Sequence, residues 1–218
     1  MRAMVKLCAC IAALAWAGAA EAQVGRGALR LSLDADLLMV AGVEINPEGP
    51  TAAYDTTVIS FGLGQEGGSH VPPGVAPMSQ LGLGVAWGIS RRLLLGVRTA
   101  LGLDVIDPDG APDNTRVLAF GLEPSLTFVP LGHRAKLFIA LAPLFQANRV
   151  KAGDDRRRTL LGGFSTGIGA LIFAGGSVSV DLGLFFEGRF GGGQVEGPND
   201  YHVRDLRGGL RFGVSLWR

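Results

Sequence analysis

Residues 81–102 read LGLGVAWGISRRLLLGVRTALG, and hydrophobicity alternates along both halves of this stretch. Large apolar side chains occupy most of the alternate positions, with mainly glycine and alanine between them. A period of two residues is typical of a β-strand, because successive side chains point to opposite faces. Only the polar tripeptide Ser90-Arg91-Arg92 separates the two halves. The stretch therefore predicts two antiparallel strands joined by a tight turn.

The same period recurs on both sides of this hairpin. Six further runs alternate in the same way, and they cover residues 29–37, 118–128, 137–145, 159–173, 178–186 and 206–216. No segment after residue 23 has a convincing helical period. The chain has 218 residues, which is enough for one domain but not comfortably for two. We therefore predict a single all-β domain.

The connections between the runs alternate in length. Tight turns fall at 90–92, 130–134 and 174–177, and longer polar segments fall at 41–78, 105–114, 149–158 and 191–202. Short turns at one end and long loops at the other are typical of bacterial outer-membrane barrels. We predict an antiparallel up-and-down transmembrane β-barrel of eight strands, with both termini on the short-turn, periplasmic side.

The strand count depends on the first long segment. Residues 57–63 also alternate, so the status of 55–64 decides the size of the barrel. A full additional span would give an odd number of strands and leave the termini on opposite faces. We interpret this run as a β-extension within the first extracellular loop. A further short strand in 41–54 or 65–78 would instead give a ten-stranded barrel.

The apolar face of the barrel is predicted to point outward. A membrane barrel turns its apolar side chains toward lipid, whereas a soluble barrel turns them inward. The opposite parity is rich in glycine, alanine and serine, and the chain has 34 glycines. A narrow eight-stranded interior is filled by side chains, so small residues must stand between the large ones. The runs are also long enough for tilted strands, which need about 9–11 residues to cross a bilayer.

Charged residues on the inward parity predict ion pairs in the lumen. One register of the last hairpin sets Arg189 opposite Asp205 and Glu187 opposite Arg207. Opposite charges directly across a sheet stabilise it by roughly 0.2–1 kcal/mol for each pair. Solvated charges on one face of a soluble sheet are the alternative interpretation.

The other charged residues expected in the lumen lie on other strands, and we call the whole set the charge ladder. A register of the hairpin around 105–114 sets Arg98 opposite Glu123. The first strand carries Asp34 and Asp36, which would meet Arg207 or Arg211 of the last strand where the barrel closes. Such pairs satisfy charges that would otherwise be buried alone.

The N-terminus predicts a cleavable signal peptide over residues 1–22. Arg2 and Lys6 form a charged segment before the apolar run of residues 7–20, and Ala20-Glu21-Ala22 fits a small-residue cleavage site. The apolar run is too short to cross a bilayer as a helix. The barrel domain would then be residues 23–218. An N-terminal membrane anchor and a lipid anchor at Cys8 or Cys10 are the alternatives. If the signal peptide is cleaved, the mature chain has no cysteine.

In these features the chain resembles the small outer-membrane β-barrel proteins, a superfamily that includes the OmpA transmembrane domain and the OmpX and OmpW groups. The resemblance covers residues 23–218 and is carried mainly by 81–96, 121–128 and 210–217. It implies a monomer in the cell outer membrane, in contact with outer-membrane lipid and lipopolysaccharide, which the outer-membrane insertion machinery assembles. Such proteins usually end in an aromatic residue in phase with the preceding hydrophobic residues. Here Trp217 is penultimate and out of phase with them, so the ending is atypical.

The sequence predicts no catalytic, cofactor or metal site. The net charge of +1 gives no reason to expect a nucleic-acid partner. His70, His133 and His202 do not stand at metal-ligand spacing. His202 has aspartates nearby but no local serine partner. The loop carboxylates are expected to be solvated, with divalent-cation bridges to lipopolysaccharide as the alternative, and they are Asp107, Asp109, Asp113, Asp154 and Asp155.

We therefore expect a non-enzymatic envelope protein. In this interpretation the barrel is a closed anchor with a charged lumen, and its extracellular loops contact lipopolysaccharide or a partner. A narrow pore or small-molecule transporter is the main alternative, since a ten-stranded barrel would be more open. A lipid-modifying enzyme and a soluble, lipocalin-like periplasmic barrel are the remaining ones.

Overall fold

The computed structural model of the chain describes residues 24–47, 54–61, 80–106, 115–130, 135–152, 155–174, 176–195 and 200–218. The expected signal peptide at 1–22 lies outside these residues, so it stays a prediction. Within the described residues the chain forms the strands β1 (Leu29–Pro47), β2 (Tyr54–Phe61), β3 (Leu81–Gly88), β4 (Leu93–Ile106), β5 (Thr115–Phe128), β6 (Ala135–Ala152), β7 (Asp155–Phe173), β8 (Val178–Val195) and β9 (Asp200–Trp217). No helix in this part of the chain is long and apolar enough to span a membrane.

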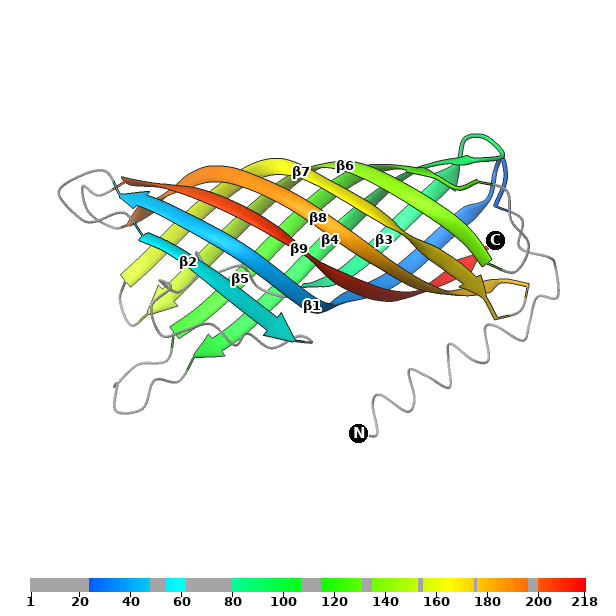
Figure 1. Cartoon of the computed structure of the whole chain (residues 1–218). Coiled ribbons are helices and arrows are strands. Elements are labelled where there is room, and N and C mark those ends of the chain that lie inside the picture. The colour runs from blue at the N-terminus through cyan, green and yellow to red at the C-terminus, as the bar shows by residue number, and fades with distance from the viewer. Residues whose placement is uncertain are drawn as a thin grey trace.

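The strands form one antiparallel sheet that closes on itself (Figure 1). From β3 to β9 each strand pairs with the next in the sequence, and β1 pairs with β9 to close the barrel. The C-terminus and the start of β1 lie at one end, together with the short connections β3–β4, β5–β6 and β7–β8. We call this the turn end of the barrel, and the opposite end the loop end.

Two short strands pair with the edge of β1 that does not pair with β9. β3 pairs with Leu29 to Ala35 of β1, and β2 pairs with Leu38 to Ile45 farther along the same edge. Both are antiparallel to β1, so β2 and β3 run in the same direction and occupy the position of one span. The described strands therefore make an eight-stranded barrel, as predicted. Residues 57–61 of the alternating run belong to β2, the loop-end half of this broken span, and residues 62–63 lie outside the described residues.

A β-bulge in β1 marks the junction between β2 and β3. Asp36 pairs with Arg211 of β9 and Leu38 pairs with Leu210, so Leu37 is an extra residue on β1. Gln80, just before β3, accepts a hydrogen bond from the Asp36 amide at 3.3 Å and donates its own amide to the Asp36 carboxylate at 3.4 Å. Beyond this point the described part of β4 pairs with β5 but not with β2.

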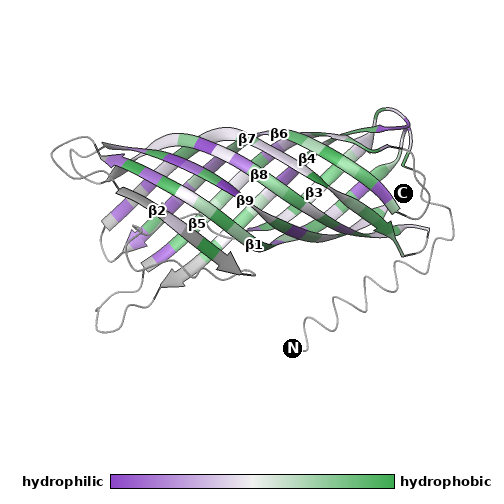
Figure 2. Cartoon of the chain, viewed as in Figure 1, coloured by the Kyte–Doolittle hydropathy of each residue, from purple (hydrophilic) through white to green (hydrophobic). Residues whose placement is uncertain are grey.

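The outward face of the barrel is apolar, as predicted. Leu83 keeps 51% of its surface exposed and Leu182 keeps 42%, while their sequence neighbours turn toward the interior. Large exposed aliphatic and aromatic side chains occur on every complete span of the wall. Figure 2 shows this alternation of hydrophobic and hydrophilic residues along the strands. An apolar outer surface around a polar interior is the arrangement of a membrane barrel.

The strands are longer at the loop end than the sequence analysis predicted. Residues 41–47, 149–152, 155–158, 191–195 and 200–202 were expected in loops and instead extend β1, β6, β7, β8 and β9. β6 has 18 residues and β7 has 19, and residues 153–154 alone connect them. The alternation of apolar with small residues is lost here, but the backbone ladder continues because every residue supplies its own donor and acceptor.

Candidate functional site: the charged lumen

A buried carboxylate, Glu187, forms the centre of the lumen. It comes from β8, and its side chain has no exposed surface. It accepts hydrogen bonds from Arg207 Nε at 2.7 Å, from Arg211 Nη2 at 3.0 Å and from Arg189 Nη2. Arg207 and Arg211 alternate with outward residues of β9, so the strand period places both guanidinium groups on the same side of the wall. The three arginines supply the charge compensation that a buried carboxylate requires.

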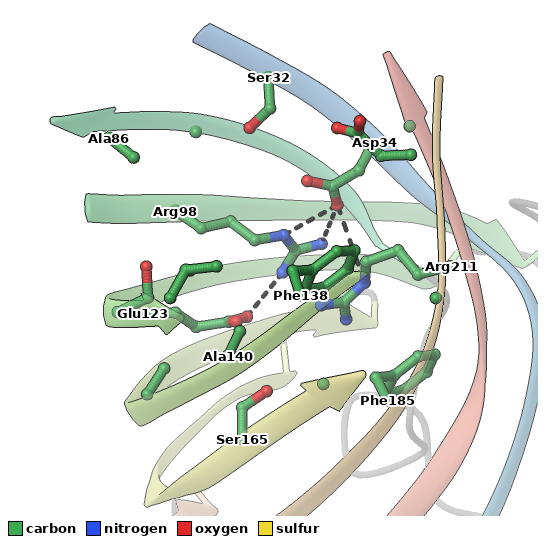
Figure 3. A pocket seen from close by; sticks show the side chains of 18 of the residues that line it. Ser32, Asp34, Ala86, Arg98, Glu123, Phe138, Ala140, Ser165, Phe185 and Arg211 are labelled. Atoms are coloured by element: carbon green, nitrogen blue, oxygen red, sulfur yellow. Dashed lines mark hydrogen bonds and ion pairs between the residues drawn. The ribbon is translucent and has the colours of Figure 1, made fainter. Parts of the chain in front are cut away.

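Arg98 of β4 forms a second node of ion pairs, with Asp34 and Glu123 (Figure 3). In the strand order of the closed barrel, β4 lies across the lumen from β8. Arg98 Nε donates to Asp34 Oδ1 at 2.8 Å, and Arg98 Nη1 donates to Glu123 Oε1 at 2.6 Å. Arg98 and Glu123 face each other in the register of β4 and β5. The node therefore ties β1, β4 and β5 together.

Arg211 joins the two nodes across the lumen. Its Nε donates to Asp36 Oδ1 at 2.7 Å and lies 3.8 Å from Asp34 Oδ1, while its Nη2 reaches Glu187. The guanidinium also lies 4.4 Å from the ring centroid of Phe185, a cation–π distance. A continuous chain of ion pairs thus crosses the interior from β4 and β5 to β8 and β9.

The structure brings most of the charge ladder expected from the sequence together. Glu187 faces Arg207, and Arg189 faces Asp205, in the register of β8 and β9. Arg189 turns its guanidinium toward Glu187 and toward the side-chain oxygen of Gln146. Asp205 Oδ1 has no hydrogen-bond partner among the described residues. Asp34 and Asp36 both meet Arg211, one of the two partners considered for them.

A further ion pair, which was not predicted from the sequence, lies nearer the turn end. Arg30 Nη2 donates to Asp181 Oδ2 at 2.8 Å, and Arg30 Nε donates to Ser215 Oγ at 2.9 Å. Ser179 donates to Asp181 Oδ1 at 2.6 Å and accepts from Trp217 Nε1 at 3.0 Å. The strand period could have indicated this pair, because Arg30 and Asp181 both lie at inward positions of their strands.

Below this pair an apolar cluster fills the turn end of the lumen. It consists of Val24, Leu94, Val129, Leu171 and Trp217, with Phe173 packed against it. The rings of Trp217 and Phe173 are 5.6 Å apart, and the Arg30 guanidinium lies 5.6 Å from the Trp217 ring. Trp217 is out of phase with the outward residues of β9 because it points into the barrel, where it is 5% exposed.

The space between the two charged layers is small. It is a cavity of about 130 Å³, bounded by Arg30 and Asp181 on one side and by Arg98, Glu123 and Arg211 on the other. Small residues make room for these side chains. A Cβ on Gly82 would stand 2.3 Å from Arg98 Nε and 2.4 Å from Asp34 Oδ1, closer than non-bonded atoms approach. The lumen is therefore packed with side chains around a small internal void.

The described residues hold no group of histidine, cysteine and carboxylate side chains that would bind a metal ion. His202 lies on the exposed face of β9. Asp155 begins β7, and His70, His133 and the other carboxylates expected in loops lie outside the described residues. The chemistry of the described interior is thus that of guanidinium groups bound to carboxylates, amides and hydroxyls.

An eight-stranded antiparallel barrel with an apolar exterior and a lumen filled by side chains is the fold of the small bacterial outer-membrane β-barrel proteins. The comparisons with solved structures agree. The chain is similar to the outer membrane protein OprG from Pseudomonas aeruginosa, with a TM-score of 0.54 and 10% identity over 89% of this chain and 98% of that chain.

Two further solved structures are similar at lower TM-scores. The N-terminal β-barrel domain of Pseudomonas aeruginosa OprF gives a TM-score of 0.44 and 8% identity over 89% of this chain and 99% of that chain. Neisserial surface protein A gives a TM-score of 0.43 and 12% identity over 85% of this chain and 98% of that chain. No protein-family model and no curated protein matches the sequence. At these identities the likeness concerns the fold.

Proposed function

We propose that this protein is an integral, monomeric outer-membrane barrel whose lumen is closed, and that it serves the envelope as a rigid anchor for its loop end. The observation that carries the proposal is the chain of ion pairs through Arg98, Arg211 and Glu187. It fills the middle of an interior that is already narrow for eight strands. A conducting pore needs a continuous water-filled path, and these side chains stand across it.

The apolar cluster at the turn end supports the same proposal. Trp217 and Leu171 lie between the small cavity and the turn-end mouth of the barrel. A solute that passed the charged layer would still have to displace this cluster. Two layers of different chemistry thus oppose passage, one by buried charge and the other by packed apolar side chains.

Conductance in planar lipid bilayers tests the closed lumen. The inserted protein is expected to give no steady current above that of the lipid alone. The matched control shortens side chains at both layers, combining Arg98→Ser, Glu123→Ser and Trp217→Ala, and is expected to conduct. Protease protection establishes that each protein has inserted. Steady single-channel conductance of the unaltered protein would overturn the closed-anchor proposal and favour a narrow pore.

We also propose that the barrel is not an enzyme. The arginines and carboxylates of the described lumen bind one another rather than surrounding a nucleophile. His202, the histidine among the described residues, is exposed on the outer wall of β9. Lipid A from cells that express the unaltered protein is therefore expected to match lipid A from cells that express His202→Ala. A modified lipid A species that requires His202 would contradict this proposal.

A further inference from the structure

The outer wall carries a basic surface at the loop ends of β5, β6 and β7. It consists of Arg116, Arg149, Lys151, Arg156 and Arg158, all exposed. Each of them lies on the outward parity, since the intervening residues Val117, Val150 and Thr159 are buried. The strand period thus places five cationic side chains on one side of the barrel wall. We call these residues the basic surface.

The register places these like charges directly opposite each other. Arg116 faces Lys151, which in turn faces Arg156, and in the next outward row Arg149 faces Arg158. Like charges opposite each other destabilise a sheet. No carboxylate occurs among the described outward side chains of β5, β6 and β7. The surface therefore favours an external anion that stands between the rows.

The adjacent wall provides a contrast. Arg204 of β9 is also outward and exposed, but it faces Glu44 of β1 in the register. There the barrel places a carboxylate of its own opposite the guanidinium. Among the described outward residues of β5, β6 and β7, by contrast, no basic side chain faces a carboxylate in the register.

Apolar side chains lie directly below the basic surface. Leu118 faces Arg149, and Leu160 follows Arg158 by one outward position. A pocket at this height of the barrel is lined by Leu118, Phe120, Arg149, Arg158 and Leu160, and it extends past Gly192 to Tyr201 and His202. An amphiphile that lies against this wall would meet apolar residues with its acyl chains and arginines with its anionic head.

We propose that the basic surface binds the phosphate groups of lipopolysaccharide in the outer leaflet, with the acyl chains packed on the apolar residues below. The inference rests on the proposed outer-membrane location and extends it by naming the residues of a binding site. Guanidinium groups bind phosphate through paired, charge-assisted hydrogen bonds, so arginine suits this ligand. The two rows offer several such groups within one patch of the wall.

The test compares lipopolysaccharide binding by the full-length protein, folded in detergent micelles, with binding by Arg149→Gln/Arg158→Gln and by a variant in which all five basic residues are glutamine. The matched control is Arg204→Gln. Dephosphorylated lipopolysaccharide and phosphatidylethanolamine serve as alternative ligands. We expect at least about tenfold weaker binding for the five-residue variant and for dephosphorylated lipopolysaccharide, and unchanged binding for Arg204→Gln.

A stability measurement keeps the test informative if binding is difficult to detect. Without lipopolysaccharide, the five-residue variant is expected to unfold at the same temperature as the unaltered protein or at a higher one, because the like charges are gone. Added lipopolysaccharide should raise the unfolding temperature of the unaltered protein and of Arg204→Gln, but not that of the variant. Equal binding and equal shifts for all proteins would overturn the site.

The result of the lipopolysaccharide test is independent of the result of the conductance test. Lipopolysaccharide binding is measured on the outer wall and does not depend on conductance, so a conducting barrel can still pass this test. A closed barrel that binds phosphatidylethanolamine as well as lipopolysaccharide fails it. A chain that remains in solution without detergent fails both proposals.

Discussion

At the scale of single residues, the packing of the lumen depends on long charged side chains that cross the interior and on glycines that leave room for them. Arg98, Arg211 and Glu187 reach across the interior because small residues stand beside them. Buried ion pairs of this kind gain little over apolar packing, yet removing one partner leaves an uncompensated charge. The charges therefore constrain one another, and each glycine next to them is part of the same arrangement.

The change Gly82→Ala tests this arrangement at one position. A Cβ there would stand within 2.5 Å of both Arg98 and Asp34, so the ion pair would have to separate or the strand would have to move. We expect the free energy of unfolding to fall by roughly 1–3 kcal/mol, as for other overpacked interiors. Urea titration of the barrel in lipid vesicles measures this change.

Gly42 on the outer face of β1 supplies the matched control. A Cβ at Gly42 would meet no atom within 4 Å, so Gly42→Ala is expected to leave stability unchanged or to raise it by about 0.4–1 kcal/mol. An equal loss of stability in both variants would mean that the cost arises from strand backbone rather than from crowding of the lumen.

At the scale of elements, the alternating period predicted most of the wall. The eight-stranded closure and the outward apolar face followed from it, because a strand with one face in lipid must place apolar residues at every second position. The register of β8 and β9 in the structure is the one chosen from opposite charges. The loop-end parts of β6 and β7 were missed because arginine and lysine replace the outward apolar residues there, and that of β8 because three glycines follow Phe190.

The bulge in β1 explains why that strand was predicted to be short. Asp34 and Asp36 point inward before it, whereas Met39 and Ala41 point inward after it, so the parity changes within the strand. A reading based on one fixed period therefore stops at Leu37. The division of one span into β2 and β3 was also not predicted from the period. It depends on a tertiary contact, in which the backbone of Gln80 bonds to Asp36 at the bulge.

Deletion of Leu37 tests the role of the bulge. The residues on both sides of Leu37 already pair with consecutive residues of β9, so the deletion leaves the register of both halves intact. We expect the barrel to fold in lipid vesicles with a yield close to that of the unaltered protein. Deletion of Leu33 is expected to lose most of the folded yield, because a slip of one residue turns neighbouring side chains to the wrong face. Gel mobility of unheated samples measures the folded fraction, and equal yields would contradict the argument.

At the scale of the whole molecule, the barrel is taller than its apolar band. On β6 the outward apolar residues extend from Leu137 to Ala147, and Arg149 and Lys151 follow them. A tilted strand of about 9–11 residues spans the hydrocarbon of a bilayer. The 18 residues of β6 therefore exceed the requirement, and the excess lies at the basic loop end. The wall would thus continue beyond the hydrocarbon into the layer of lipid head groups.

Cysteine labelling in intact cells locates this boundary. With Cys8 and Cys10 replaced by serine, single cysteines are placed on the outward face of β7 at residues 156, 160, 164 and 168. A membrane-impermeant maleimide added outside is expected to label position 156 and to leave 164 and 168 unlabelled, with partial labelling at 160. The reason is physical access: positions 164 and 168 lie within the apolar band, where lipid acyl chains exclude a charged reagent.

Cell disruption and detergent extraction supply the comparison for this experiment. After extraction and unfolding in urea all four positions should react, since the unfolded chain no longer holds 164 and 168 in an apolar layer that excludes the charged reagent. Labelling of 164 and 168 in intact cells, at the same rate as 156, would place the apolar face in water and contradict a membrane barrel. Labelling that appears only after the outer membrane is opened, and then first at 156, would keep the barrel but reverse its orientation. The predicted pattern therefore joins the outward apolar parity, the length of the strands and the basic loop end in one measurement.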